Sequence, residues 1–199
     1  MVESGLFYST IIDPLLRQLR KQVASEVKSG ENVIDIACGT GEQVFDLVEK
    51  AESVTGIDLS ASMVKHANRV MHQRKIRNAS IEVADATDLS AYYHKNFDVA
   101  VLSMALHQFH AELQKPILEE IKKVARRVII LDYATPLPRN VVGRVCKVAE
   151  FLAGIEHNRN FKKYTKAGGI DAVLAANGFE VQKTKYFGKG AFSLVVAKH

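Results

Sequence analysis

Val-Ile-Asp-Ile-Ala-Cys-Gly-Thr-Gly, residues 33–41, is the stretch that decides the fold. A run rich in β-branched, apolar residues ends in a tight glycine turn, and Glu42 then begins a pattern typical of a helix. Gly39 and Gly41 lack a Cβ, so a loop here can adopt positive φ and lie close to a ligand. Because the first N–H groups of a helix are unpaired and favour negative groups, we expect a ligand that is at least partly anionic.

Strand-like and helix-like patterns alternate on both sides of this turn. We expect strands over residues 32–37, 53–58, 79–84, 97–103 and 127–133. We expect helices over residues 10–28, 42–50, 60–73, 111–124, 139–153 and 166–177. Two further strand-like runs, 179–187 and 191–197, flank Gly188-Lys189-Gly190 and predict a hairpin. This order predicts an α/β, doubly wound, Rossmann-like sheet of seven strands, mostly parallel, with a C-terminal antiparallel hairpin and helices on both faces.

Length and composition are those of a single globular domain. The chain has 199 residues, 47% of them hydrophobic and 25% charged, and a formal net charge of +5. No apolar run approaches the roughly 18 residues of a membrane span. Two cysteines do not form a disulfide framework, so we expect a soluble protein of the reducing cytoplasm. We expect the protein to be either a monomer or a homodimer. The basic run at 122–127 falls where a helix should end, which favours a helix-dipole role over a binding patch.

Polar residues occupy the carboxyl ends of the expected strands. They are Asp35, Asp58, Asp85, Ser103 and Asp132. Aspartate is common in turns, so each has an ordinary structural explanation. Four acidic residues at one edge of one sheet nevertheless favour a ligand site there, since open sheets of this kind bind ligands beyond the carboxyl ends of their strands.

The glycine turn is not that of a dinucleotide site. The pattern G-x-G-x-x-G needs a third glycine for close packing of helix and strand, and Val44 stands there instead. An oxidoreductase is therefore a weaker interpretation. Asp58 is well spaced to hydrogen-bond ribose hydroxyls, so the residues alone predict an adenosine-containing cofactor.

Four segments together resemble a known family. Asp-Ile-Ala-Cys-Gly-Thr-Gly at 35–41, Gly-Ile-Asp-Leu-Ser-Ala-Ser-Met at 56–63, Val-Ala-Asp-Ala-Thr-Asp-Leu at 83–89 and the run at 97–107 resemble, in order and spacing, the motifs of class I S-adenosylmethionine-dependent methyltransferases. The resemblance covers roughly residues 30–135. It is strongest to the small group that includes the ubiquinone and menaquinone biosynthesis methyltransferases.

The resemblance implies S-adenosylmethionine as the cofactor, with S-adenosylhomocysteine as its product. It implies cofactor-binding roles for Asp35, Ala37, Gly39, Gly41, Asp58, Leu59, Met63, Asp85, Ala86 and Ser103. Asp35 would lie near the methionine ammonium, Asp58 would hold the ribose hydroxyls, and Asp85 with the Ala86 backbone would meet the adenine amino edge. Cys38 reads as a packing residue and not as a nucleophile.

Transfer from a sulfonium mainly needs a nucleophile aligned about 3 Å from the methyl carbon in a dry site. His107, just past the fourth strand, is the candidate for a general base if the acceptor must lose a proton. The alternative is a surface or loop-capping histidine. His110 stands at an expected helix start, which weakens its case. No His or Cys cluster has metal-ligand spacing, so the sequence predicts no metal site.

The acceptor must be recognised outside the common core. We divide the chain into an N-terminal helix or cap (1–29), a cofactor-binding core (30–135), a substrate-covering segment (136–165) and a final helix and hairpin (166–199). The predicted acceptor-contacting residues are Tyr8, Met104, Tyr133, Arg159 and Tyr164. A covering segment of about 30 residues favours a small-molecule acceptor over a protein.

Two alternatives remain open from the sequence. One is the same chemistry on RNA, although the chain lacks the aromatic-interleaved basic module typical of RNA readers, so a nucleic-acid partner is not expected. The other is a protein that binds S-adenosylmethionine without transferring its methyl group.

Overall fold

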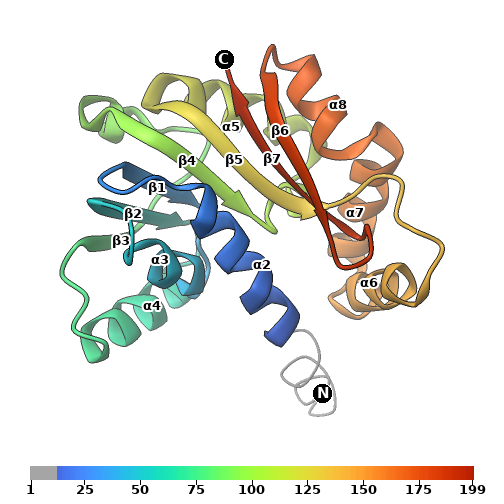
Figure 1. Cartoon of the computed structure of the whole chain (residues 1–199), viewed down its shortest axis with the longest axis horizontal. Coiled ribbons are helices and arrows are strands. Elements are labelled where there is room, and N and C mark those ends of the chain that lie inside the picture. Colours follow the sequence, from blue (N-terminus) through green and yellow to red (C-terminus); the bar gives the residue numbers. More distant parts are fainter. Residues whose placement is uncertain (1–12) are drawn as a thin grey trace.

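Figure 1 shows one twisted sheet flanked by helices, in a computed structural model that describes residues 13–199. The seven strands lie in the order β3-β2-β1-β4-β5-β7-β6. Their bounds are β1 Asn32–Ile36, β2 Ser53–Asp58, β3 Ala79–Val83, β4 Phe97–Ser103, β5 Ala125–Tyr133, β6 Glu180–Phe187 and β7 Phe192–Lys198. Strands β1 to β5 pair in parallel, β7 runs antiparallel to β5, and β6 runs antiparallel to β7. The predicted mostly parallel sheet with a C-terminal antiparallel hairpin is confirmed.

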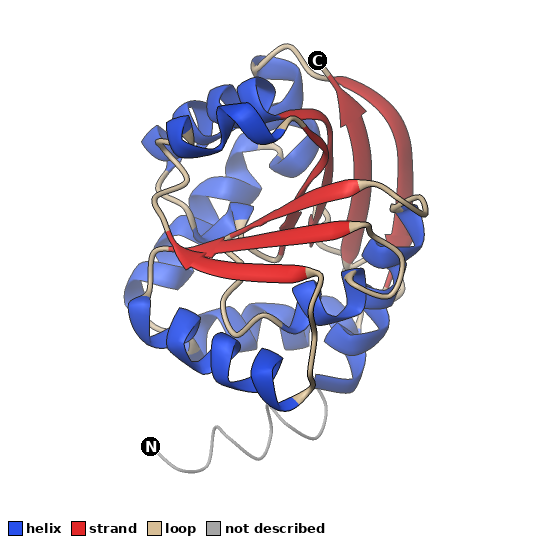
Figure 2. Ribbon diagram, turned by 90° about the vertical axis from the view of Figure 1, so that its left-hand side faces the viewer, coloured by secondary structure: helices blue, strands red, loops and turns tan. Residues whose placement is uncertain are grey.

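Helices cover both faces of the sheet, as Figure 2 shows. The α-helices are α2 Asp13–Glu26, α3 Glu42–Leu47, α4 Ala61–Gln73, α5 Ala111–Val124, α6 Val141–Leu152, α7 Ile155–Ala167 and α8 Gly169–Ala176. Two short 3-10 helices, η2 Ser90–Lys95 and η3 Leu106–Gln108, precede β4 and α5. No helix in the described part of the chain is long and apolar enough to cross a membrane.

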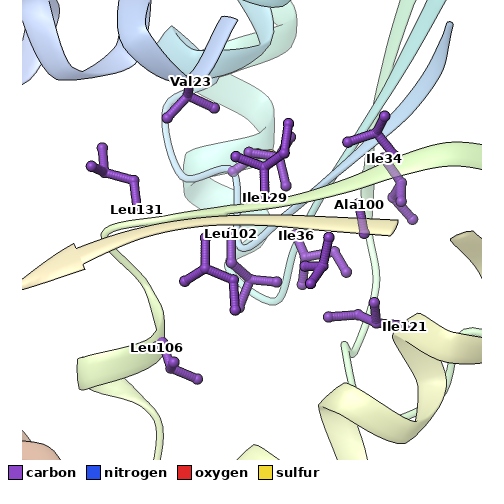
Figure 3. Packing of buried hydrophobic residues seen from close by; sticks show 14 of the residues in the cluster. Val23, Ile34, Ile36, Ala100, Leu102, Leu106, Ile121, Ile129 and Leu131 are labelled. Atoms are coloured by element: carbon purple, nitrogen blue, oxygen red, sulfur yellow. The ribbon is translucent and has the colours of Figure 1, made fainter. Parts of the chain in front are cut away.

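The core fills the space on both sides of the central strands. In Figure 3, Val23 of α2 lies with Ile129 and Leu131 of β5 on one side, while Leu102 of β4 and Ile121 of α5 lie on the other. All five side chains are at most 2% exposed. Strands buried on both faces explain why the sequence shows continuous apolar runs there and no alternation.

Many element bounds agree with those expected from the sequence. Strands β2 and β4 and helix α5 match residue for residue. Ser60 caps α4 as expected, because its Oγ accepts a hydrogen bond from the Met63 N–H at 3.4 Å. The main error is after α6: helix α7 was not predicted, and the helix expected over 166–177 begins at Gly169.

Helix α6 carries an apolar stripe, Val141, Val145, Val148 and Leu152, of which most members face away from the protein. Val141, Val148 and Leu152 are 70%, 51% and 62% exposed. Its buried residues are Gly143, Cys146 and Glu150. A Cβ at Gly143 would lie 2.1 Å from the Pro138 carbonyl oxygen. Helix α6 can therefore lie this close to the segment at Pro138 only with the glycine side facing it.

Gly41, the N-cap of α3, is required by packing as well as by backbone geometry. Its φ is 81°, and a Cβ there would lie 3.0 to 3.1 Å from atoms of Phe45, Ala67 and Ile81. Gly30 has the same φ of 81°, but none of the described residues has an atom within 4 Å of its Cβ position. The two positions therefore separate backbone strain from overpacking.

We expect Gly41→Ala to lower the free energy of unfolding by about 1–3 kcal/mol more than Gly30→Ala, since overpacking adds to the left-handed strain that both variants share. Urea unfolding of the two variants and the wild type measures the difference. Equal losses would mean that Phe45, Ala67 and Ile81 move aside without cost.

The order of the strands determines where a ligand can bind. Strand β1 lies between β2 and β4, so the connections that follow β1 and β4 leave the sheet in opposite directions along its edge. In open sheets of this type the crevice beyond such a switch point is the usual ligand site.

Candidate active site

A cleft of about 560 Å³ opens beyond the carboxyl ends of β1, β2 and β4. Its lining residues come from α2, the glycine turn, the starts of α3 and α4, and the segment after β4. They are Leu16, Arg20, Asp35, Ala37, Cys38, Gly39, Thr40, Glu42, Gln43, Asp58, Ser60, Met63, Ser103, Met104, Ala105, Gln108, Phe109 and Leu131. Seven residues that the sequence singled out are among them: Asp35, Ala37, Gly39, Asp58, Met63, Ser103 and Met104.

Asp35 is the buried acid of this cleft. It is 1% exposed, and its Oδ2 has no hydrogen-bond partner among the described residues. Burial, together with the nearby carboxylate of Asp58, raises the pKa of Asp35 well above its ordinary value. An unpartnered buried carboxylate in a cleft is suited to receive a cationic or N–H donor group of a ligand.

Asp58 orders the glycine turn. Its Oδ2 accepts a hydrogen bond from the Gly39 N–H at 2.8 Å, and its Oδ1 accepts one from the Ser60 N–H at 2.9 Å. A carboxylate oxygen can accept more than one hydrogen bond, so hydroxyl groups of a ligand can also donate to Asp58. A Cβ at Gly39 would meet no atom of residues 13–199 within 4 Å, so these residues leave open space beside the backbone of the turn.

Two non-glycine residues at the cleft have strained backbones. Ala37, just after β1, has φ 58°, and Met104, just after β4, has φ 56°. The left-handed region is unfavourable for residues with a Cβ and occurs most often at functional sites. Both residues line the cleft, which supports its assignment as the functional site.

Four of the predicted cofactor residues do not line this cleft: Gly41, Leu59, Asp85 and Ala86. Gly41 packs against the core as described above, and Leu59 is 72% exposed. Asp85 is exposed, and its Oδ1 accepts hydrogen bonds from the Thr87 N–H and hydroxyl, both at 2.8 Å. Leu59 follows β2, and Asp85 and Ala86 follow β3.

Cys38 lines the cleft but has the properties of a packing residue. It is 9% exposed. Burial, followed by the charges of Asp35 and Asp58, raises the pKa of its thiol, so the reactive thiolate is disfavoured.

A second, smaller cavity of about 90 Å³ adjoins the cleft. Leu16, Met104 and Gln108 line both spaces. The remaining lining residues are His107, Tyr133, Val145, Cys146, Ala149, Glu150, Ala153 and Phe192. The inner face of α6 thus forms one wall of this cavity, and the ends of β5 and β7 form another.

His107 is buried between two carboxylates and is 2% exposed, which contradicts the alternative of a surface histidine. Its Nδ1 lies 2.6 Å from Asp132 Oδ1, and its backbone N–H donates to Asp132 Oδ2 at 3.0 Å. Its Nε2 lies 3.5 Å from Glu150 Oε1, which also accepts a 2.8 Å hydrogen bond from the Tyr133 hydroxyl. We call Asp132, His107, Glu150 and Tyr133 the buried charge cluster.

The carboxylates keep His107 protonated. Burial by itself lowers the pKa of His107, but the charge and hydrogen bond of Asp132 and those of Glu150 outweigh it and raise the pKa to about 9. For Glu150, burial raises the pKa, but the hydrogen bond and charge of His107 and the Tyr133 hydroxyl leave it lowered overall. At neutral pH the cluster holds one imidazolium between carboxylates.

The predicted acceptor residues are distributed differently from what the sequence suggested. Met104 and Tyr133 line the small cavity. Tyr164 is fully buried and donates its hydroxyl to the Tyr133 carbonyl at 2.9 Å, so it supports the site without lining it. Arg159 is exposed and lines neither space, and Tyr8 lies outside the described residues.

Glu150 and Gln108 are two polar site residues that sequence reasoning missed. The sequence prediction assigned no role to Glu150 within the helix expected over 139–153. The available signal was the spacing of Gly143, Cys146 and Glu150, which puts small residues and one acid on a single helical face. His110 lies apart from the cluster and approaches Glu156 of α7 at 2.9 Å.

The two adjoining spaces can hold a polar ligand and a small apolar one side by side. The larger has an unpartnered acid, an acid beside an open glycine turn, and apolar contacts from Met63 and Leu131. This set fits a nucleoside carrying a cationic amino-acid end. No group of three His, Cys, Asp or Glu residues between 13 and 199 is arranged to hold a metal ion.

Comparison with known proteins agrees with this fit. A family model described as a methyltransferase domain matches residues 27–178. The 23S rRNA (uracil(1939)-C(5))-methyltransferase of Pseudoalteromonas translucida is 32% identical over 97 residues, 47% of this chain and 22% of that protein. Demethylmenaquinone methyltransferase of Corynebacterium kroppenstedtii is 30% identical over 130 residues, 63% of this chain and 52% of that protein. The matches therefore span at most about half the length of these two relatives.

Solved structures share the fold at low sequence identity. A SAM-dependent methyltransferase from Aquifex aeolicus has a TM-score of 0.66 at 18% identity, covering 92% of this chain and 88% of that one. Magnesium protoporphyrin IX methyltransferase from Synechocystis, solved with bound SAH, has a TM-score of 0.65 at 20% identity, covering 92% and 83%.

Proposed function

The chain belongs to the methyltransferase-domain family that matches residues 27–178, and from this premise we propose that it transfers a methyl group from S-adenosylmethionine to a small-molecule acceptor. The observation that carries the proposal is the pair of adjoining spaces at the end of the sheet. The larger one is lined by Asp35, Asp58 and the glycine turn as well as by apolar side chains, and the other is smaller and largely apolar.

Residues of the cleft would hold the cofactor by charge and hydrogen bonding. We assign Asp35 to the cationic amino group, directly or through water, and Asp58 to the ribose hydroxyls. The Ala37 and Gly39 backbones line the methionyl part, and Met63 packs against the nucleoside. The sulfonium supplies an already activated methyl group, so the main task of the protein is alignment and exclusion of water.

The remaining predicted contacts come from the residues that end or follow β2, β3 and β4. We keep Leu59, Asp85 and Ala86 as contacts of the adenine, because they follow β2 and β3 next to the cleft. Ser103 ends β4 and lines the cofactor cleft. Met104 follows it and lines both the cleft and the small cavity, where the acceptor would lie.

His107 takes a positioning role in this proposal in place of the general-base role considered from the sequence. Both of its ring nitrogens face carboxylates, and its pKa of about 9 leaves it protonated at neutral pH. An imidazolium has no lone pair to accept a proton. It therefore fixes the places of Asp132 and Glu150.

The test is a screen for S-adenosylhomocysteine release. Purified protein, labelled S-adenosylmethionine and pools of small metabolites are combined, and a parallel arm receives total RNA. We expect label transfer to a compound in a small-molecule pool. Asp35→Asn should lose this activity, while Asp171→Asn, on the exposed surface of α8, should keep it.

The same screen distinguishes the alternatives. Label transfer to RNA alone, with an RNA affinity that falls steeply with salt, would support an RNA methyltransferase instead. One relative named above carries an rRNA methyltransferase name, so this arm is needed. Cofactor binding without transfer to any pool would favour a non-catalytic binding protein.

Asp58→Ala is expected to weaken S-adenosylhomocysteine binding by about 1–3 kcal/mol, because hydrogen bonds to a charged group are lost. The Gly39 and Ser60 N–H groups also lose their acceptor, which loosens the glycine turn. Calorimetric titration measures the change, with Asp171→Ala as the control. Unchanged affinity would show that Asp58 does not contact the nucleoside.

A further inference from the structure

Glu150 carries a hydrogen-bonding capacity that no other residue in the described part of the chain uses. Its side chain is 9% exposed and lines the small cavity. Oε1 accepts from the Tyr133 hydroxyl at 2.8 Å and faces His107, whereas the buried Oε2 has no partner among the described residues. A buried carboxylate oxygen without a donor is unfavourable, so a ligand that donates a hydrogen bond would relieve it.

The groups around Glu150 fix the character of that ligand. His107 of η3 is cationic, and Asp132 and Tyr133 come from β5. Cys146 of α6 has a thiol pKa raised by burial to about 11, and His157 of α7 acts on Glu150 only through its charge. Two carboxylates around one imidazolium leave an excess of one negative charge, so the cluster disfavours anions and groups that only accept hydrogen bonds.

The rest of the cavity wall is apolar. Leu16, Met104, Val145, Ala149 and Phe192 contribute aliphatic and aromatic surface. The volume is about 90 Å³. Since a cavity needs roughly 10–15 Å³ of such volume to hold one water molecule, this cavity has room for a ring-sized molecule.

We propose that Glu150 selects the methyl acceptor by accepting a hydrogen bond from it, so that the acceptor is a small, mainly apolar molecule with a neutral O–H or N–H donor. This inference rests on the proposed function, since it takes the small cavity as the acceptor site. It assigns to Glu150 a specificity-determining role that neither the sequence motifs nor the methyltransferase family match supplies.

The test uses ring-sized probes on protein saturated with S-adenosylhomocysteine. Phenol and aniline carry a donor, toluene carries neither donor nor acceptor, and benzaldehyde only accepts. Ligand-observed NMR titration gives the four dissociation constants. We expect phenol or aniline to bind about tenfold more tightly than toluene, with benzaldehyde weakest, because a hydrogen bond to a charged group is gained. The phenol and aniline arms distinguish a hydroxyl from an amine acceptor.

Glu150→Gln should reverse this preference. The Tyr133 hydroxyl and His107 hold the Gln carbonyl in the place of Oε1, so the amide N–H₂ takes the place of Oε2 and donates. Benzaldehyde should then bind more tightly than phenol. Glu119→Gln, on the exposed face of α5, changes the charge equally and should leave the wild-type order intact.

The outcomes separate the two proposals. If wild-type protein fails to bind S-adenosylhomocysteine, the proposed function falls. If it binds S-adenosylhomocysteine but prefers toluene to both donors, or if Glu150→Gln keeps the wild-type order, the role of Glu150 is overturned. The wild-type comparison decides the question by itself should the variant not fold.

Discussion

Replacing His107 with leucine is expected to lower the free energy of unfolding by about 3–5 kcal/mol at pH 7, because removing one partner of a buried ion pair leaves uncompensated charge. Asp132 and Glu150 would both keep buried carboxylates without the imidazolium between them. Urea unfolding measures the change. His110→Leu is the matched control, since His110 and Glu156 are 45% and 72% exposed and such pairs contribute little. Similar small losses in both variants would contradict the ion-paired state of His107.

The same variant should change the pH dependence of stability. The pKa of His107 rises from an ordinary 6.5 to about 9 in the folded state, so the folded protein binds more protons between these values than the unfolded chain. The stabilisation from His107 is therefore complete below about pH 6.5 and is lost as the pH rises through 9. His107→Leu should remove this decline from a series of unfolding curves between pH 6 and 10. A wild-type stability that is flat across this interval would argue against a protonated His107.

Asp35→Asn is expected to weaken binding of S-adenosylmethionine on the order of 100-fold or more, because a buried carboxylate would no longer pair with the cationic amino group. Calorimetry measures this loss. Methylthioadenosine, which lacks the amino-acid end, should bind the wild type and the variant equally. Equal losses for both ligands would mean that the variant damages the cleft as a whole, and no loss would place the amino group elsewhere.

Asp35→Asn should at the same time stabilise the ligand-free protein. Burial and the Asp58 charge raise the pKa of Asp35, so the folded state holds a proton that the unfolded chain releases. Stability from this group therefore falls as the pH rises above the ordinary value of 3.8 toward the raised one. Asparagine removes that penalty, and we expect a higher melting temperature at pH 7. A lower melting temperature would contradict the unpaired state of Asp35.

The sequence was sufficient to predict the sheet because local and global signals agree there. β-branched runs, a capped helix at Ser60 and a glycine turn at 39–41 each point to the same strand–helix alternation. Burial of the central strands β1, β4 and β5 on both faces adds continuous apolar runs to these signals.

The inward face of α6 could not be predicted from the sequence, because tertiary contacts override an apolar stripe. The close approach of Gly143 to Pro138 fixes the rotation of the helix and turns Val148 and Leu152 outward. Glu150 then points inward to a histidine that lies far away in the sequence. The spacing of residues in one helix cannot reveal such a partner.

His107 illustrates the same limit. The sequence predicts His107 just past the strand at 97–103 and Asp132 at the end of the strand at 127–133, but a single histidine carries no sign of its own burial. The pairing of β4 with β5 brings the two together at 2.6 Å, and α6 closes the cluster. Its properties therefore follow from the assembled fold.

The most direct test of the account is a calorimetric titration of the wild-type protein with S-adenosylmethionine, S-adenosylhomocysteine and NAD. A cleft with Val44 in place of a third glycine and an unpartnered Asp35 should bind both sulfur ligands and give no heat with NAD. Tight binding of NAD without a response to either sulfur ligand would contradict it.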